Sequence, residues 1–171
     1  MKTAKRVSGS AASSAGKAAK RAACPAEMAF LELLRTTDQL TRRLAGVLKD
    51  EELSSNQYNV LRILRGAAER GEAGSGPTGL ACGEIGDRMI TRDPDITRLL
   101  DRLEKRTLVS RCRETKDRRT VWAQITPEGL KLLARLDEPV LATHIELLGH
   151  LGPRRLKLLT DLLRLARQPY G

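Results

Sequence analysis

The stretch from residue 94 to 126 decides the fold, and it reads PDITRLLDRLEKRTLVSRCRETKDRRTVWAQIT. Its first part places Ile96, Leu99, Leu100 and Leu103 at the spacing of one apolar face of a helix. A strand-like run then begins at Leu108 and Val109, is broken over residues 114–117, and resumes over residues 120–125. A helix that can enter a groove of DNA, followed by a basic hairpin that can reach the next groove, is typical of nucleic-acid-binding proteins. By itself the pattern also fits a solvated helix beside a charged surface hairpin.

The distribution of charge favours the nucleic-acid interpretation. The formal net charge is +10, and it is concentrated in two places. Residues 1–23 carry six basic residues and no acidic ones, and residues 105–119 carry seven basic and two acidic residues. The rest of the chain is close to neutral. A focused positive patch attracts phosphates, which a charge spread evenly for solubility would not require.

Length and composition indicate one mainly helical domain with extensions. The chain has 171 residues, only 2% of them aromatic, and it is rich in leucine, which suits packing of helix on helix. No run of 18 apolar residues is present, and the basic N-terminus lacks the apolar segment of a signal peptide. We therefore expect no contact with a membrane and a cytoplasmic location.

The sequence offers no candidate catalytic or metal centre. The three cysteines are widely spaced and belong to no metal-binding motif, and only two histidines are present. The glycine-rich segment 71–79 lacks the ending of a phosphate-binding loop and is interpreted as a flexible connection. We expect no cofactor, no metal and no enzymatic activity.

Helix signals along the chain predict a helix-turn-helix flanked by two helical regions. The expected helices span about residues 26–49, 54–71, 81–89, 94–105, 126–148 and 152–167. The second helix shows a capping-box pattern at Ser54 and Gln57, and the fifth begins with Thr126 as its cap. The fourth is expected to begin at Pro94 with Asp93 as its N-cap. The fold class is therefore mainly α with a small β-hairpin wing, while residues 1–25 are expected to form a disordered basic tail.

These residues resemble the MarR family of winged-helix regulators over roughly residues 31–163. The most specific part is DRRTVWAQITPEGLKLL, residues 117–133, which is similar to the family's wing signature of Asp-x-Arg followed by the next helix. Residues 96–111 are similar to its recognition helix and first wing strand. Thr107 stands where a glycine commonly ends that helix, and the linker over residues 69–79 is long for the family.

The resemblance implies a homodimer that binds pseudo-palindromic double-stranded DNA, in most cases as a repressor. A winged helix over about residues 53–126 would be joined to dimerisation helices over about residues 26–49 and 127–167. Many members release DNA when a small phenolic or other aromatic ligand binds between the lobe and the dimerisation region.

The resemblance and the chemistry of the residues together assign the expected DNA contacts. Arg119 would enter the minor groove from the wing with Asp117 holding it, and Arg118 is the substitute if the register is shifted by one. The simpler alternative for Arg119 is an ion pair across the hairpin. Thr97, Arg98 and Arg102 would read base edges from the outer face of the fourth helix, close to Pro94. Asp95 would either accept a hydrogen bond from cytosine or only cap the helix. The expected phosphate contacts are Arg88, Arg92, Arg111, Arg113 and Lys116.

Two other classes of function compete with a transcriptional regulator. The first is a winged-helix protein-interaction module without sequence-specific DNA binding, against which the focused charge and residues 117–119 argue. The second is a small enzyme, for which the sequence offers no nucleophile with a base and no metal set.

Overall fold

The computed structural model describes residues 24–72, 79–91, 93, 95–113 and 120–168. The elements are α1 (Pro25–Lys49), α2 (Ser55–Glu69), β1 (Leu80–Ala81), α3 (Cys82–Arg88), α4 (Ile96–Lys105), β2 (Val109–Arg113), β3 (Val121–Ile125), α5 (Pro127–Leu148), a short 3₁₀ helix (Gly149–Leu151) and α6 (Gly152–Arg167). The mainly helical fold class and the order of the six predicted helices are confirmed. No helix in the described part of the chain is long and apolar enough to cross a membrane.

Two predicted helix starts are confirmed by their caps. Ser54 Oγ accepts from the Gln57 amide at 3.2 Å, and Gln57 Oε1 accepts from the Ser54 amide at 2.9 Å, which completes the capping box of α2. Thr126 Oγ1 accepts from the Gly129 amide at 3.1 Å, and Pro127 occupies the first turn of α5. Each cap satisfies amides that have no partner within the helix.

The predicted start of α4 was wrong by two residues. The N-cap is Asp95, whose Oδ1 accepts from the Arg98 amide at 2.9 Å, and the helix begins at Ile96. Asp93, the predicted cap, instead lies in the turn, where its Oδ1 accepts from the Asp95 amide at 2.9 Å. Short acidic side chains compete for both roles, and tertiary contacts of the turn decided between them.

The sheet contains one strand more than the predicted hairpin. β2 and β3 form the antiparallel hairpin in the register Val109 opposite Ile125, and β1 pairs with the other side of β3 to give the order β1-β3-β2. Two residues are too short a run for a periodicity argument, which is why β1 was missed. On the sheet, Trp122 lies opposite Ala81 and Cys112 and is buried. Its indole Nε1 has no hydrogen-bond partner among the described residues.

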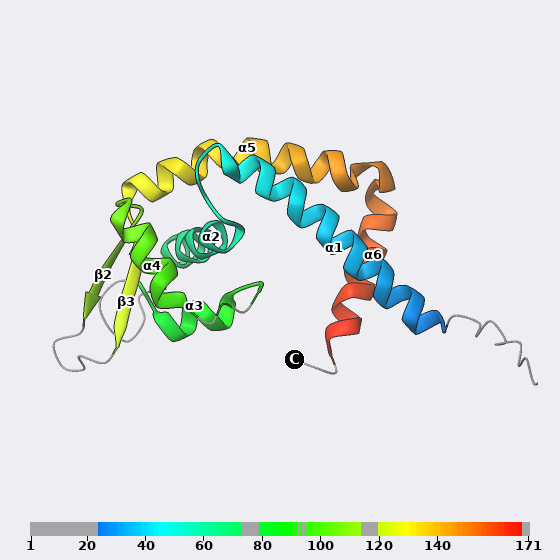
Figure 1. Cartoon of the computed structure of the whole chain (residues 1–171), viewed down its shortest axis with the longest axis horizontal. Coiled ribbons are helices and arrows are strands. Elements are labelled where there is room, and N and C mark those ends of the chain that lie inside the picture. The colour runs from blue at the N-terminus through cyan, green and yellow to red at the C-terminus, as the bar shows by residue number, and fades with distance from the viewer. Residues whose placement is uncertain (1–23, 73–78, 92, 94, 114–119, 169–171) are drawn as a thin grey trace, which may run out of the picture.

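One hydrophobic core fills the lobe made by α2, α3, α4, the sheet and the first part of α5. Its fully buried side chains include those of Leu61, Ile85, Leu100, Leu103 and Leu133. Figure 1 shows α5 running along the top of the molecule from the sheet to the far end, where α6 turns back beside α1. The lobe and the α1–α6 arm are therefore joined by α5 and by the end of α1.

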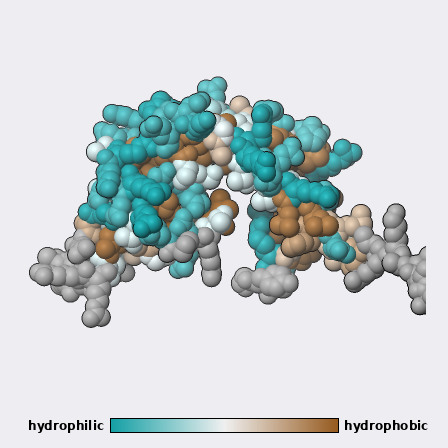
Figure 2. All heavy atoms as spheres, viewed as in Figure 1, coloured by the Kyte–Doolittle hydropathy of each residue, from teal (hydrophilic) through white to brown (hydrophobic). Residues whose placement is uncertain are grey.

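The α1–α6 arm is apolar but largely exposed. Among the described residues of α1 only Leu48, near its C-terminus, is buried, and no residue of α6 is. Figure 2 shows hydrophobic side chains gathered on this arm. The exposed large apolar residues of the arm and of the adjoining end of α5 are Met28, Phe30, Leu31, Leu33, Leu34, Leu141, Ile145, Leu158, Leu162 and Leu165.

Candidate nucleic-acid interface

The turn between α3 and α4 is held in place by two asparagines from the first turns of α2. Asn59 Oδ1 accepts from the Ile90 amide at 2.8 Å, and Asn56 Nδ2 donates to Asp93 Oδ2 at 2.7 Å. The hydrogen bonds from the Asp95 amide and from Asn56 lower the pKa of Asp93, so this carboxylate stays ionised. These contacts fix where α4 begins relative to the lobe. The two asparagines carry no recognisable binding pattern in the sequence, so their role was not predicted.

The helix α4 divides into a buried face and an exposed face. Leu99, Leu100 and Leu103 are buried in the lobe. Thr97, Arg98 and Arg102, the predicted base-reading residues, are all exposed on the outer face. The three side chains are therefore exposed on the part of α4 that does not face the core of the lobe.

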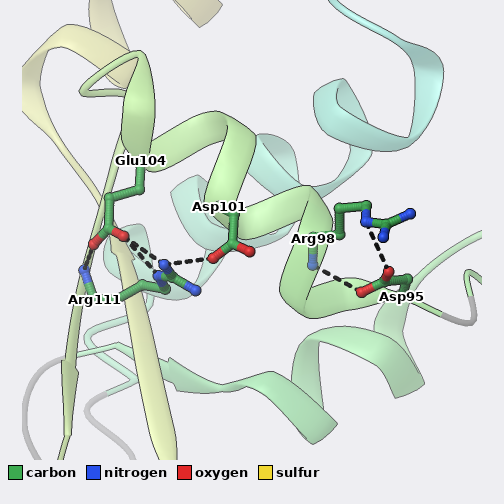
Figure 3. A network of polar contacts seen from close by, with 5 residues as sticks. All are labelled: Asp95, Arg98, Asp101, Glu104 and Arg111. Atoms are coloured by element: carbon green, nitrogen blue, oxygen red, sulfur yellow. Dashed lines mark hydrogen bonds and ion pairs between the residues drawn. The ribbon is translucent and has the colours of Figure 1, made fainter.

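Asp95 caps α4 and also pairs with Arg98. Besides accepting from the Arg98 amide, its Oδ2 lies 3.2 Å from Arg98 Nε, as Figure 3 shows. Of the two alternatives for Asp95, the capping role is present in the structure. The pair with Arg98 is largely exposed, so it is weak and can exchange for another acceptor.

Arg111, a predicted phosphate contact, lies between β2 and α4 and is mostly buried. Its Nη2 lies 2.6 Å from Asp101 Oδ1 and 2.5 Å from Glu104 Oε2, and its Nε donates to Glu104 Oε2 at 2.9 Å (Figure 3). The hydrogen bonds that Arg111 donates to Glu104 and Asp101 raise the pKa of its guanidinium above the ordinary value for arginine. In this conformation the guanidinium joins the first wing strand to the recognition helix.

Arg88, a second predicted phosphate contact, points toward the end of α2. Its Nη1 lies 2.5 Å from Glu72 Oε2, and Arg70 Nε lies 2.6 Å from Glu72 Oε1. The two arginines lower the pKa of Glu72 to about 2. Arg88 keeps about a third of its side chain exposed, so a phosphate can still approach it.

The remaining predicted contacts fall on or beside segments that the structure leaves out. Only the backbone of Arg113 is described, and it pairs with Val121 at the end of the hairpin where the two strands are connected. The predicted residues Arg92, Pro94, Lys116, Asp117, Arg118 and Arg119 lie outside the described residues.

Comparison with known proteins supports the regulator interpretation. A family model described as transcriptional regulator SarA/Rot matches residues 43–136. The HTH-type transcriptional regulator FarR of Neisseria gonorrhoeae is 28% identical over 131 residues, which cover 77% of this chain and 83% of FarR.

Solved structures agree with the observed fold. The crystal structure of a MarR transcription factor from Planctomyces limnophilus is 41% identical, with a TM-score of 0.63, and the match covers 85% of this chain and 99% of that one. A mutant of Escherichia coli MarR complexed with operator DNA is 22% identical, with a TM-score of 0.68 over 80% of this chain and 91% of that one, and it supports the fold. The family model and the Planctomyces relative together show that this chain belongs to the MarR family of DNA-binding, winged helix-turn-helix transcriptional regulators.

Proposed function

We propose that this regulator is a homodimeric repressor that places the two copies of α4 in successive major grooves of a pseudo-palindromic operator. The observation that carries the proposal is the outer face of α4, where Thr97, Arg98 and Arg102 are exposed while the opposite face is buried. Arginine pairs with guanine through two hydrogen bonds, and threonine contacts the thymine methyl group, so this surface has the chemistry of base reading.

The basic residues around α4 would supply the sequence-independent part of binding. Arg88, Arg92, Arg113 and Lys116 are proposed phosphate contacts, and Arg119, supported by Asp117 and Arg118, is the proposed minor-groove contact. Pro94 and Asp95 would lie nearest the floor of the major groove. Arg111 could reach a phosphate only after leaving Asp101 and Glu104.

The exposed apolar arm is proposed to be the dimer interface. Phe30 on α1 and Leu165 on α6 are each about 60% exposed in the single chain, and they belong to a much larger apolar set on the same arm. A hollow of about 730 Å³ between α1, the end of α5 and α6 is lined by Leu33, Leu40, Leu148, Leu159 and Leu163, among others. A contiguous apolar surface of this kind is rarely left in water, and a second copy of the chain would cover it.

Release by a small aromatic acid is the proposed form of regulation. A hollow of about 320 Å³ beside α2 and the end of α3 is lined by Ile63 and Ile90 and by the guanidinium groups of Arg62, Arg70 and Arg88. Arg70 and Arg88 are paired with Glu72, so Arg62 is the proposed partner of an anion. The size and mixed lining of the hollow suit a small aromatic anion. NadR, a fold neighbour at 26% identity with a TM-score of 0.62, was solved in complex with 4-hydroxyphenylacetate. A thermal-shift screen of aromatic acids, repeated on Arg62→Ala, tests this hollow directly.

A gel-shift experiment on the regulator's own upstream DNA tests the main proposal. We expect a single retarded complex that resists competitor DNA, and light scattering of the free protein should give twice the chain mass. Binding without sequence preference would favour the alternative, a winged-helix protein-interaction module. A stable monomer at micromolar concentration would contradict the proposed interface.

A further inference from the structure

The C-terminal turns of α1 and α4 face each other across the side chain of Arg106. Its Nη1 donates to the Glu52 carbonyl at 2.8 Å and its Nη2 donates to the Glu51 carbonyl at 3.0 Å. Both carbonyls belong to the turn that ends α1, which is closed by the Leu53 amide donating to the Leu48 carbonyl at 3.1 Å. The Glu51 and Glu52 carbonyls lie just beyond Asp50, the C-cap of α1, and so near the negative end of the helix dipole, where a guanidinium is stabilising.

The same turn is held from its other side by α5. Arg135 Nε donates to Glu51 Oε1 and Arg135 Nη2 donates to Glu51 Oε2, each at 2.9 Å. This two-pronged pair, with a smaller contribution from the charge of Arg106, lowers the pKa of Glu51. Glu51 therefore offers its carboxylate to α5 and its carbonyl to the residue that follows α4.

The end of α4 also contacts the start of α5. Thr126 Oγ1 donates to the Thr107 carbonyl at 2.7 Å, and the Thr126 amide donates to the Leu108 carbonyl at 3.1 Å. The backbone of Gly129 lies so close to the Leu108 carbonyl that a Cβ at this position would collide with it. The ends of α1 and α4 and the first turns of α5 thus form a closed ring of contacts, called here the junction (residues 51–52, 106–108, 126–129 and 135).

We propose that Arg106 is a positioning residue that fixes the angle between α4 and the dimerisation helices α1 and α5, and thereby the half-site spacing that the dimer accepts. The proposal rests on the proposed dimeric, operator-binding function. The two long helices span 25 and 22 residues, so a small rotation at the junction moves α4 a long way relative to the two-fold axis. Of the described residues in the turn after α4, Arg106 alone donates side-chain hydrogen bonds to the turn after α1.

The test uses DNA duplexes enriched from a random pool by the wild-type protein. Their two half-sites are then moved apart or together by one base pair, and affinity is measured on each spacing. The wild type should bind the parent spacing more tightly than the shifted ones. In Arg106→Ala the ratio of these affinities should fall about tenfold, as expected for losing a charge-assisted pair of hydrogen bonds. Arg106→Lys keeps the charge but not the two-pronged donation, so its preference should be intermediate.

Two controls separate positioning from other roles of Arg106. Lys105→Ala removes an exposed neighbouring charge at the end of α4 and should keep the spacing preference. If Arg106 instead contacted a phosphate, Arg106→Ala would lower the slope of log affinity against log salt by about one, with the spacing preference unchanged. That result, or an unchanged preference with an unchanged slope, would overturn the proposal. If Arg106→Ala does not fold, Arg135→Gln tests the same ring from its other side.

A second measurement does not need DNA. Cys24, Cys82 and Cys112 are first changed to serine, and Asp87→Cys then supplies one site for a spin label in each chain. The distance between the two labels reports the distance between the two lobes of a dimer. The distribution of distances should broaden in Arg106→Ala and remain narrow in Lys105→Ala. An equally narrow distribution in both variants would overturn the proposal while leaving the dimer intact. The absence of any dipolar signal, with a monomer mass by light scattering, would mean that the proposed function had failed as well.

Discussion

Arg111 in β2 and Glu104 in α4 are joined by three hydrogen bonds. The Arg111 amide donates to Glu104 Oε1 at 3.2 Å, and its Nε and Nη2 donate to Glu104 Oε2 at 2.9 and 2.5 Å. A side chain that is only 20% exposed and fully engaged in this way holds the first wing strand against the recognition helix. The wing and α4 would then meet DNA as one rigid unit.

We therefore expect Glu104→Gln to weaken operator binding about tenfold, because the strand loses a charge-assisted contact with α4. Asp87→Asn is the matched control: it also removes an acidic charge, from the exposed face of α3, and it should leave binding unchanged or slightly tighter. Gel shifts on one operator compare the two variants. If Arg111 were mainly a phosphate contact, Glu104→Gln would release it from its ion pair with Glu104. Operator binding would then become tighter, and log affinity would fall more steeply with log salt.

Arg98→Ala should relax base preference within each half-site, since Arg98 lies on the outer face of α4. The loss on the parent operator should be about 1–3 kcal/mol, and one base position should become tolerant of substitution. Affinities across a panel of single-base operator variants measure this. Arg154→Ala, at an exposed position on α6, removes the same charge away from α4 and should show an unchanged panel.

Arg119→Ala should weaken binding to the parent operator by about 1–3 kcal/mol, because it removes the proposed minor-groove contact. Circular dichroism and light scattering should show an unchanged fold and assembly. Since the wing tip would read groove width, the loss should be larger on operators whose flanks have a narrow minor groove. Wild-type affinity in this variant would leave the cross-hairpin ion pair as the better interpretation of Arg119.

Thr107→Gly should raise the free energy of unfolding by about 1 kcal/mol. Thr107 has a φ of +57°, and its turn is closed by the Leu108 amide donating to the Leu103 carbonyl at 3.0 Å. A left-handed backbone is unfavourable for a β-branched residue and easy for glycine, and the gain outweighs the extra chain entropy of glycine in the unfolded state. Urea unfolding measures the change. Arg102→Gly, at an exposed position inside α4, should lower the free energy of unfolding by a similar amount. A Thr107→Gly variant that was also destabilised would contradict this account.

Removing residues 1–23 should lower non-specific affinity more than operator preference. The segment carries six basic residues and no acidic ones, so its contacts would be with phosphates and would act through counterion release. The slope of log affinity against log salt, measured on random and operator duplexes, should become shallower by a similar amount on both. An unchanged slope after the deletion would show that the segment does not touch DNA.

The sequence predicted the elements whose signals are local. Ser54 with Gln57 and Thr126 with Pro127 gave two helix starts correctly, because a cap and its partner lie within three residues of each other. The apolar spacing of Leu99, Leu100 and Leu103 likewise gave the buried face of α4.

The missed features depend on partners far apart in the chain. β1 forms only because Leu80 meets Ala123. The start of α4 is shifted because Asn56 engages Asp93, 37 residues away. In the sequence Arg106 is one of seven basic residues in 105–119, whereas in the structure it donates to the two carbonyls of the turn after α1. Neither periodicity nor a motif predicts contacts between residues so far apart. The sequence therefore predicts the charge of an arginine but not the group to which it donates its hydrogen bonds.

Trp122 has a consequence for experiment. It is the only tryptophan of the chain, and it is buried in β3 between residues of the two neighbouring strands. Its indole N–H has no partner in the described part of the chain, so the emission of the ring should respond to a group that comes to accept a hydrogen bond from it. The protein therefore carries a built-in fluorophore close to the end of the wing where its two strands are connected, and a titration with unlabelled DNA can be followed by fluorescence at that one place.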